Sequence, residues 1–212
     1  MSNPRLINAL SKLELVPAWT AVVDAPSPLD VVAPIGLRPW IVAALAKSDL
    51  VLAITATGRE AEDLVDQLHS FLPADAVAEF VSWETLPHER LSPSSDVIGR
   101  RLAVLRRLRH AAADSQPPIQ VVVAPIRAIL QPLVSGISDL APVQLRKGDE
   151  RDFDAVISDL AAAGYARVDL VEKRGQFAVR GGLVDVFPPS EEHPLRIEFW
   201  GDTVEEIRTF AV

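Results

Sequence analysis

The amino-acid sequence predicts an α/β protein of two domains, and three observations support this fold class. Short apolar runs of strand length alternate with amphipathic helical patterns over roughly the first 130 residues. The later part of the chain is strand-like after a single helix. The length of 212 residues also exceeds a typical single domain of about 100 to 200 residues. We therefore expect one domain over residues 1–135 and a second over residues 136–212.

The first domain shows strands and helices in alternation. Leu50–Thr55 (LVLAIT) is a continuous apolar run, and in Glu60–Leu72 the apolar residues recur on one helical face. The further elements expected here are a helix over Leu37–Ala46, a strand over Val77–Ser82, a helix over Asp96–Ala113 and a strand over Ile119–Ala124. Apolar strands separated by helices predict a parallel sheet that is covered on both faces.

The second domain is predicted to be α+β with an antiparallel sheet. Asp152–Ala163 reads as an amphipathic helix that ends at Gly164, and Val143–Arg146 is a candidate short strand. Five strand candidates are separated by Gly, Pro, Ser and Asp: Arg167–Glu172, Gln176–Val179, Gly182–Phe187, Leu195–Trp200 and Glu205–Val212. This pattern is typical of an antiparallel meander with a helix on one face.

Composition narrows the classes of function. The chain has no cysteine, which excludes disulfides, thiolate metal sites and a cysteine nucleophile and favours a reducing compartment. No secretory signal pattern and no run approaching about 20 apolar residues is present, so we expect a cytoplasmic protein with no membrane partner. The formal net charge of -8 argues against a general DNA-coating protein.

The motifs of nucleotide hydrolysis and metal catalysis are missing from the sequence. No G-x-x-x-x-G-K-[ST] motif occurs, and residues 24–40, where it could stand, contain Gly36 as their single glycine and no lysine. The four histidines form no metal-binding pair, and no G-x-S-x-G elbow is present. We therefore predict no catalytic residue, no metal site and no cofactor, and a chain that is not an enzyme by itself.

Three segments carry a family resemblance. They are Ser82–Ser95 (SWETLPHERLSPSS), which is followed by DVIGRRLAVLRRL, then Arg174–Pro188 (RGQFAVRGGLVDVFP) and Pro194–Asp202 (PLRIEFWGD). In this order they resemble the N-terminal module of bacterial transcription-repair coupling factors and of their structural relative UvrB. The resemblance implies a UvrB-like α/β domain over residues 1–135, without a nucleotide site, and a small UvrA-binding α+β domain over 136–212. UvrB keeps a P-loop, so its absence here favours the coupling factors.

The resemblance also implies a function and a set of site residues. The chain would recruit UvrA to stalled RNA polymerase in transcription-coupled nucleotide excision repair, and downstream domains would bind RNA polymerase and translocate along DNA with ATP. The implied UvrA contacts are Arg180, Arg196 and Trp200. Alternate strand positions would place Arg196, Glu198 and Trp200 on one face. In an alternative interpretation, Trp200 covers the core and the arginines pair with Glu198 or Asp185.

A second basic candidate lies in the helix that follows the first motif. Arg100, Arg101, Arg106 and Arg107 are expected on the face opposite Leu102, Leu105 and Leu108. In the family this region is close to the place where UvrB meets damaged DNA, although a solvated helix face is the commoner meaning of such a run. Two rival functions also stay open: nucleotide-dependent DNA damage verification of the UvrB type, and an intramolecular scaffold that restrains the motor.

Overall fold

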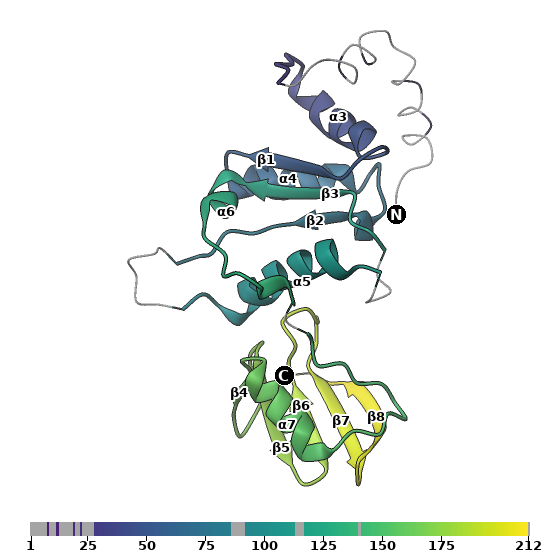
Figure 1. Ribbon diagram of the computed structural model, residues 1–212, viewed down its shortest axis with the longest axis vertical. Coiled ribbons are helices and arrows are strands. Elements are labelled where there is room, and N and C mark those ends of the chain that lie inside the picture. Colours follow the sequence, from purple (N-terminus) through teal and green to yellow (C-terminus); the bar gives the residue numbers. More distant parts are fainter. Residues whose placement is uncertain are drawn as a thin grey trace. The chain divides into compact units, whose positions relative to one another are not determined.

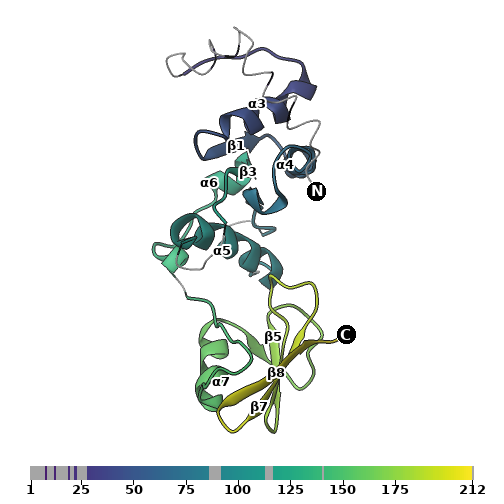
Figure 2. The ribbon, with the colours of Figure 1, turned by 90° about the vertical axis from the view of Figure 1, so that its right-hand side faces the viewer.

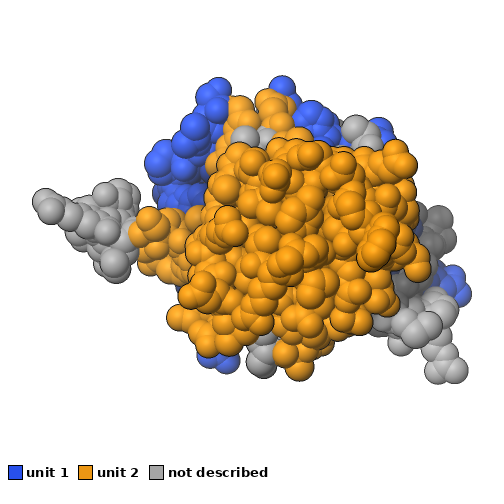
Figure 3. Space-filling model, turned by 90° about the horizontal axis from the view of Figure 1, so that it is seen from below, with its two compact units in different colours: residues 1–83, 104–135 blue, residues 84–103, 136–212 orange. Residues whose placement is uncertain are grey.

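The computed structural model describes residues 28–85, 92–112, 117–139 and 141–211, together with the single positions 8, 12, 19 and 22. Residues 86–91 of the first motif, and the expected helix and strand ends at 113 and 212, lie outside the described residues. The chain forms two compact units, which Figure 3 distinguishes by colour. Unit 1 contains residues 1–83 and 104–135, and unit 2 contains residues 84–103 and 136–212.

Unit 1 contains a parallel sheet of three strands. These are β1 (Val51–Thr55), β2 (Val77–Glu79) and β3 (Val121–Pro125), in the order β1-β3-β2. Both outer strands run parallel to β3, with Val51 and Val77 each paired with Val121. The other elements of this part of the chain are η1 (Ile35–Leu37), α3 (Arg38–Leu45), α4 (Gly58–Leu68), η2 (Ala74–Ala76), α5 (Ser95–His110) and α6 (Ile126–Leu130). The predicted parallel α/β sheet is confirmed.

The central strand β3 separates two apolar clusters and is buried along its whole length. On one face Val121 and Val123 pack with residues of α3 and α4, including Ala43, Ala61 and Leu68. On the other face Val122 and Ala124 pack with Val104 of α5 and Ala128 of α6. Figure 1 shows β3 between β1 and β2. Burial on both faces is what a continuous apolar run such as VVVA requires.

Unit 2 contains a mixed sheet of five strands in sequence order. They are β4 (Ala166–Arg167), β5 (Gln176–Arg180), β6 (Leu183–Val186), β7 (Leu195–Trp200) and β8 (Thr203–Thr209). The pairs β5-β6, β6-β7 and β7-β8 are antiparallel, as predicted, whereas the short β4 runs parallel to β5. The fold class is therefore confirmed as a parallel-sheet unit plus a separate α+β unit, with one parallel pair at the edge of the second sheet.

Two expected strands of the second domain differ from the structure. The strand expected over Arg167–Glu172 ends at Arg167, because Val168 and Val171 turn into a small apolar cluster with Ala178 instead of continuing the ladder. The segment Val143–Arg146 is not a strand. Its side chains Val143 and Leu145 still pack against the core, so their spacing reflects burial without strand pairing.

Helix α7 (Phe153–Ala162) covers one face of the second sheet. Its buried residues Val156 and Leu160 pack against Phe177, Ile197 and other inward residues of the strands. Figure 2 shows α7 on one side of β5, β7 and β8. The side chain of Asp152 caps the helix by accepting a 2.6 Å hydrogen bond from the backbone N–H of Ala155. We name the opposite face of β5 to β8, away from α7, the outer face.

The first part of α5, residues 95–103, belongs to unit 2. Arg174, which precedes β5, holds this part of the helix through an ion pair with Asp96 at 3.5 Å. The Arg174 guanidinium also lies over the ring of Phe187, 5.1 Å from its centroid, and donates a 3.2 Å hydrogen bond to the carbonyl of Glu191. One arginine of the second motif therefore connects α5 to the strand region.

Candidate partner-binding surface

Strand β7 directs its side chains alternately to the two faces of the sheet. Ile197 and Phe199 are buried and belong to the core beneath α7. Arg196, Glu198 and Trp200 occupy the intervening positions, because successive side chains of a strand point to opposite faces. The three residues therefore share the outer face.

The strand register places Arg180 on the same face. Arg180 of β5 pairs with Leu183 of β6, and Leu183 pairs with Glu198 of β7. Residues that are directly opposite one another in antiparallel strands project to the same side. Residues that pair directly across the strands form a row. The next row on this face contains Asp185, which pairs with Arg196. Arg180 and Arg196 thus stand in neighbouring rows of the outer face.

Arg196 is held by a carboxylate of the adjacent strand. Its Nε donates a 2.6 Å hydrogen bond to Oδ1 of Asp185, and its Nη2 donates a 2.7 Å hydrogen bond to Oδ2. These hydrogen bonds and the charge of Asp185 raise the pKa of the Arg196 guanidinium above its ordinary value. The guanidinium also lies over the ring of Phe210, 5.2 Å from the centroid. The structure therefore confirms the alternative interpretation for this residue: Arg196 pairs with Asp185.

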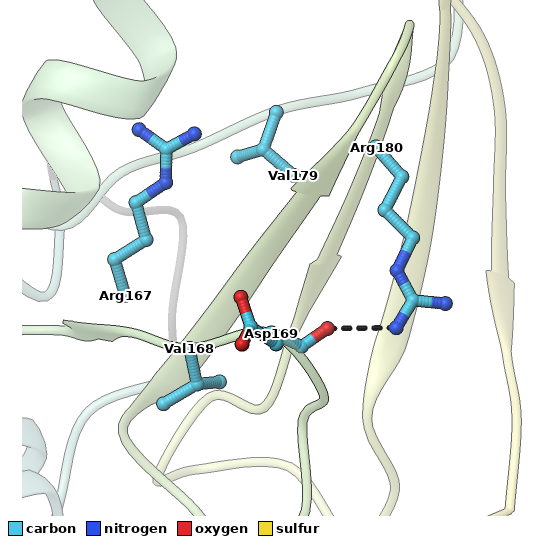
Figure 4. A pocket seen from close by; sticks show the side chains of 5 residues that line it. All are labelled: Arg167, Val168, Asp169, Val179 and Arg180. Atoms are coloured by element: carbon cyan, nitrogen blue, oxygen red, sulfur yellow. Dashed lines mark hydrogen bonds between the residues drawn. The ribbon is translucent and has the colours of Figure 1, made fainter.

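Arg180 lies at the edge of a cavity of about 510 Å³. The cavity is lined by Arg167, Val168, Asp169, Val179 and Arg180, and Figure 4 shows the two arginines on either side of Asp169. Nη2 of Arg180 donates a 2.7 Å hydrogen bond to the backbone carbonyl of Asp169. A backbone carbonyl carries no full charge, so this contact of the exposed Arg180 is a hydrogen bond and not an ion pair.

Trp200 is the most prominent apolar group of the outer face. Its side chain is 81% exposed, so the alternative in which it covers the core is wrong. Trp200 ends β7 at the turn into β8, next to the β5-β6 turn, where Phe199 N donates a 2.8 Å hydrogen bond to Gly182 O. The positive φ of Gly181 (59°) and Gly201 (60°) allows both turns to be tight. The two hairpin ends thus place Arg180 and Trp200 at one end of the sheet.

Two residues of this surface, Arg208 and Phe210, were missed by the sequence analysis. Arg208 pairs with Arg196 across the strands and forms ion pairs with Glu198, at 2.5 Å, and with Glu206, at 3.5 Å. Phe210 was missed because it lies outside the motifs that carry the resemblance. Arg167, which lines the cavity beside Arg180, was missed for the same reason, and its pairing with Phe177 assigns it to the core side of the sheet. Alternation along β8 places Glu206 and Arg208 on one face, and this signal could have identified the ion pairs.

The predicted face of the α5 arginines is wrong at Arg101, and the predicted inward position of Leu108 is also wrong. Arg101 is 1% exposed, whereas Leu108, which was expected to point inward, is 42% exposed. The buried residues of the helix include Arg101 and Val104, and Leu105 packs against the same apolar cluster as Val104. Burial of the Arg101 side chain lowers the pKa of its guanidinium.

A further arginine of this helix makes backbone contacts inside unit 1. Arg107 donates hydrogen bonds from Nη2 to the backbone carbonyls of Asp75, at 2.5 Å, and Pro117, at 2.9 Å. Arg100 is exposed and Arg106 is half-buried. The four candidate DNA contacts therefore do not form one exposed basic face.

Neither a metal cluster nor a membrane-spanning helix occurs among the described residues. No group of three or more His, Cys, Asp or Glu side chains there could hold a metal ion. None of the helices in that part of the chain has the length and apolar character needed to cross a bilayer.

Comparison with known proteins places the outer face within a described domain. Residues 143–212, which contain the whole second sheet, match the family described as "UvrB interaction domain". The transcription-repair-coupling factor of Mycobacterium tuberculosis (strain CDC 1551 / Oshkosh) is 49% identical over 188 residues, 88% of this chain and 15% of the relative. This chain belongs to the transcription-repair-coupling factor family. The match to an interaction domain fits a module that is not catalytic.

More distant coupling factors and UvrB proteins are also similar to this chain. The coupling factor of Escherichia coli (strain K12) is 33% identical over 166 residues, 76% of this chain and 14% of the relative. The UvrABC system protein B of Lactococcus lactis subsp. cremoris (strain MG1363) is 34% identical over 180 residues, 81% of this chain and 26% of the relative. The chain spans about 15% of the length of the coupling factors that it matches best among these.

Proposed function

We propose that this chain is the UvrA-recruiting part of a transcription-repair coupling factor and that it docks UvrA through the outer face of unit 2. The observation that carries the proposal is Trp200, 81% exposed, on the same face of the matched interaction domain as Arg180 and Arg196. A tryptophan with so much exposed apolar surface is costly in water, and its burial against a partner recovers that cost.

The chemistry of the surface suits a protein partner. Tryptophan and arginine are the residues most enriched in binding hot spots, because each offers a large planar group that combines apolar contact with directional hydrogen bonds. The neighbouring ion pairs of Arg208 with Glu198 and Glu206 supply a polar rim. An interface of this kind combines an aromatic anchor with charges that fix its orientation.

The whole protein would connect repair with transcription. In this proposal, the coupling factor recruits UvrA to stalled RNA polymerase, while further domains bind RNA polymerase and act on DNA as an ATP-dependent translocase. We also propose that residues 1–135 form the UvrB-like domain without a nucleotide site, and that residues 136–212 form the UvrA-binding domain. DNA contact by Arg100, Arg101, Arg106 and Arg107 stays a prediction.

The test is calorimetric titration of UvrA into this chain and into an Arg180→Ala, Trp200→Ala double variant. Both side chains are exposed, so the variant should fold normally, which circular dichroism and thermal unfolding would verify. Arg151→Ala is the matched control, because Arg151 forms an exposed ion pair with Asp159 on the α7 side of the same unit.

We expect the native chain and the control to bind UvrA and the double variant to lose at least about 2 kcal/mol of binding free energy, the size of a hot spot. A native chain that does not bind UvrA, or a double variant that binds as well as the native chain, would contradict the proposal. Binding of ATP to the isolated chain would instead favour the UvrB-type damage-verification function.

A further inference from the structure

The guanidinium of Arg196 has one planar edge occupied and another open. An arginine side chain carries five N–H donors in a fixed fork. Asp185 takes Nε and one hydrogen of Nη2, which is the side-on edge. Nη1 and the second hydrogen of Nη2, the end-on edge, have no hydrogen bond within the described part of the chain. The Arg196 side chain is 31% exposed, so part of it remains open to solvent.

Asp185 and Phe210 limit the positions that Arg196 can take. Asp185 lies in the middle of β6 and is 6% exposed, so its carboxylate is fixed by the strand. The ring of Phe210 supports one side of the guanidinium plane. Two parallel charge-assisted hydrogen bonds then set both the distance and the rotation of that plane. A long side chain that is restrained in this way loses little additional entropy when it binds a partner.

We infer that Asp185 is a positioning residue of the docking surface, which presents the end-on edge of Arg196 to a carboxylate side chain of the protein partner. The inference rests on the proposed function, because it names the group that the same outer face would recognise. A carboxylate matches two parallel N–H donors in geometry and in charge. Arg208, which pairs with Arg196 across the strands, is already engaged by Glu198 and Glu206, so the end-on edge of Arg196 is the donor pair that this part of the face offers to an acidic group.

The role of Asp185 can be separated from a general effect on folding by a double-mutant cycle. The variants are Asp185→Asn, Arg196→Lys and their combination, and the readout is the affinity for UvrA. Asn cannot accept both hydrogen bonds, and Lys keeps the charge but has no planar edge. Asp159→Asn is the matched control, because it alters the exposed ion pair with Arg151 and leaves the outer face unchanged.

We expect each of the two single variants to bind UvrA about tenfold more weakly than the native chain. This is the loss of affinity expected when one directional contact of an interface is removed. The combination should be no weaker than Arg196→Lys alone, because Asp185 acts through Arg196. The control should bind like the native chain. A folded Asp185→Asn chain of native affinity, native affinity of Arg196→Lys, or additive losses in the combination would each overturn the inference.

A second readout needs no partner. The Nε–H signal of Arg196 in nitrogen-15 NMR should be sharp and slow to exchange with water in the native chain and in Asp159→Asn, and should be lost in Asp185→Asn. A signal that is unchanged in Asp185→Asn would overturn the positioning role. If the signal depends on Asp185 but the native chain does not bind UvrA, then recruitment and the carboxylate contact both fail, while the restraint of Arg196 is upheld.

Discussion

A Cβ atom on Gly99 would lie 2.1 Å from Cβ of Pro189 and 2.9 Å from its Cγ, so these two residues approach as closely as they do because position 99 has no side chain. Gly99 stands inside helix α5, where glycine normally destabilises a helix by roughly 0.5–1 kcal/mol relative to alanine. Pro189 follows β6 in the same unit. The close contact gives a physical reason for a glycine in the middle of this helix.

We expect Gly99→Ala to lower the free energy of unfolding by about 1–3 kcal/mol, the usual cost of overpacking, even though alanine is the better helix former. Denaturant unfolding followed by circular dichroism would measure the change. Gly58→Ala is the matched control in α4, where a Cβ would meet nothing within 4 Å, and it should be neutral or slightly stabilising. Equal stability of the two variants would show that the contact with Pro189 does not restrict position 99.

Much of the fold could be predicted from the sequence because its elements have strong local signals. The strand expected over Leu50–Thr55 is β1, over Val51–Thr55, and the helix expected over Asp152–Ala163 is α7, over Phe153–Ala162. Continuous apolar runs and capped helices are determined by neighbouring residues. The parallel pairing of β4 with β5 could not be predicted, because two paired residues leave no pattern in the sequence.

The site could be predicted only in part, because its details depend on which strands are neighbours. Alternation along β7 was enough to place Arg196 and Trp200 on one face. The burial of Asp185 could not be predicted, because its partner Arg196 lies on the next strand. The register between the two strands cannot be determined from the sequence of either strand alone. The same limit explains the error over Arg101, whose burial is a property of the packed fold.

Removal of Arg196 should destabilise the chain in addition to weakening any partner contact. Arg196→Ala leaves the carboxylate of Asp185, 6% exposed, without its two hydrogen bonds. A buried acceptor that loses its partner costs roughly 1–3 kcal/mol, so we expect a loss of this size in the free energy of unfolding. Arg151→Ala should change it by less than about 0.5 kcal/mol, because its ion pair with Asp159 is exposed. Thermal and denaturant unfolding of both variants would check this difference.

A substitution at Gly182, in the turn beside Trp200, should also destabilise the chain. A Cβ on Gly182 would lie 2.8 Å from the backbone carbonyl oxygen of Phe199, and a backbone atom cannot move aside as a flexible side chain can. We expect Gly182→Ala to lower the free energy of unfolding by about 1–3 kcal/mol. It should also shift the indole N–H NMR signal of Trp200, which Trp200→Phe would assign. Gly36→Ala, where a Cβ would meet nothing within 4 Å, should leave both quantities unchanged.

The last prediction separates structural arginines of α5 from arginines available to nucleic acid. Arg107 donates hydrogen bonds to the carbonyls of Asp75 and Pro117, so it links α5 to two other segments of unit 1. Hydrogen bonds from a charged donor contribute about 1.5–3 kcal/mol, so we expect Arg107→Ala to lower the free energy of unfolding by about 2 kcal/mol. Exposed Arg100→Ala should have little effect on stability. If the chain binds a fluorescent DNA duplex at low salt, Arg107→Ala should leave the affinity unchanged, because a phosphate contact requires a guanidinium that is not already engaged. A loss of DNA affinity in Arg107→Ala with no loss of stability would reverse this assignment and make α5 a nucleic-acid contact.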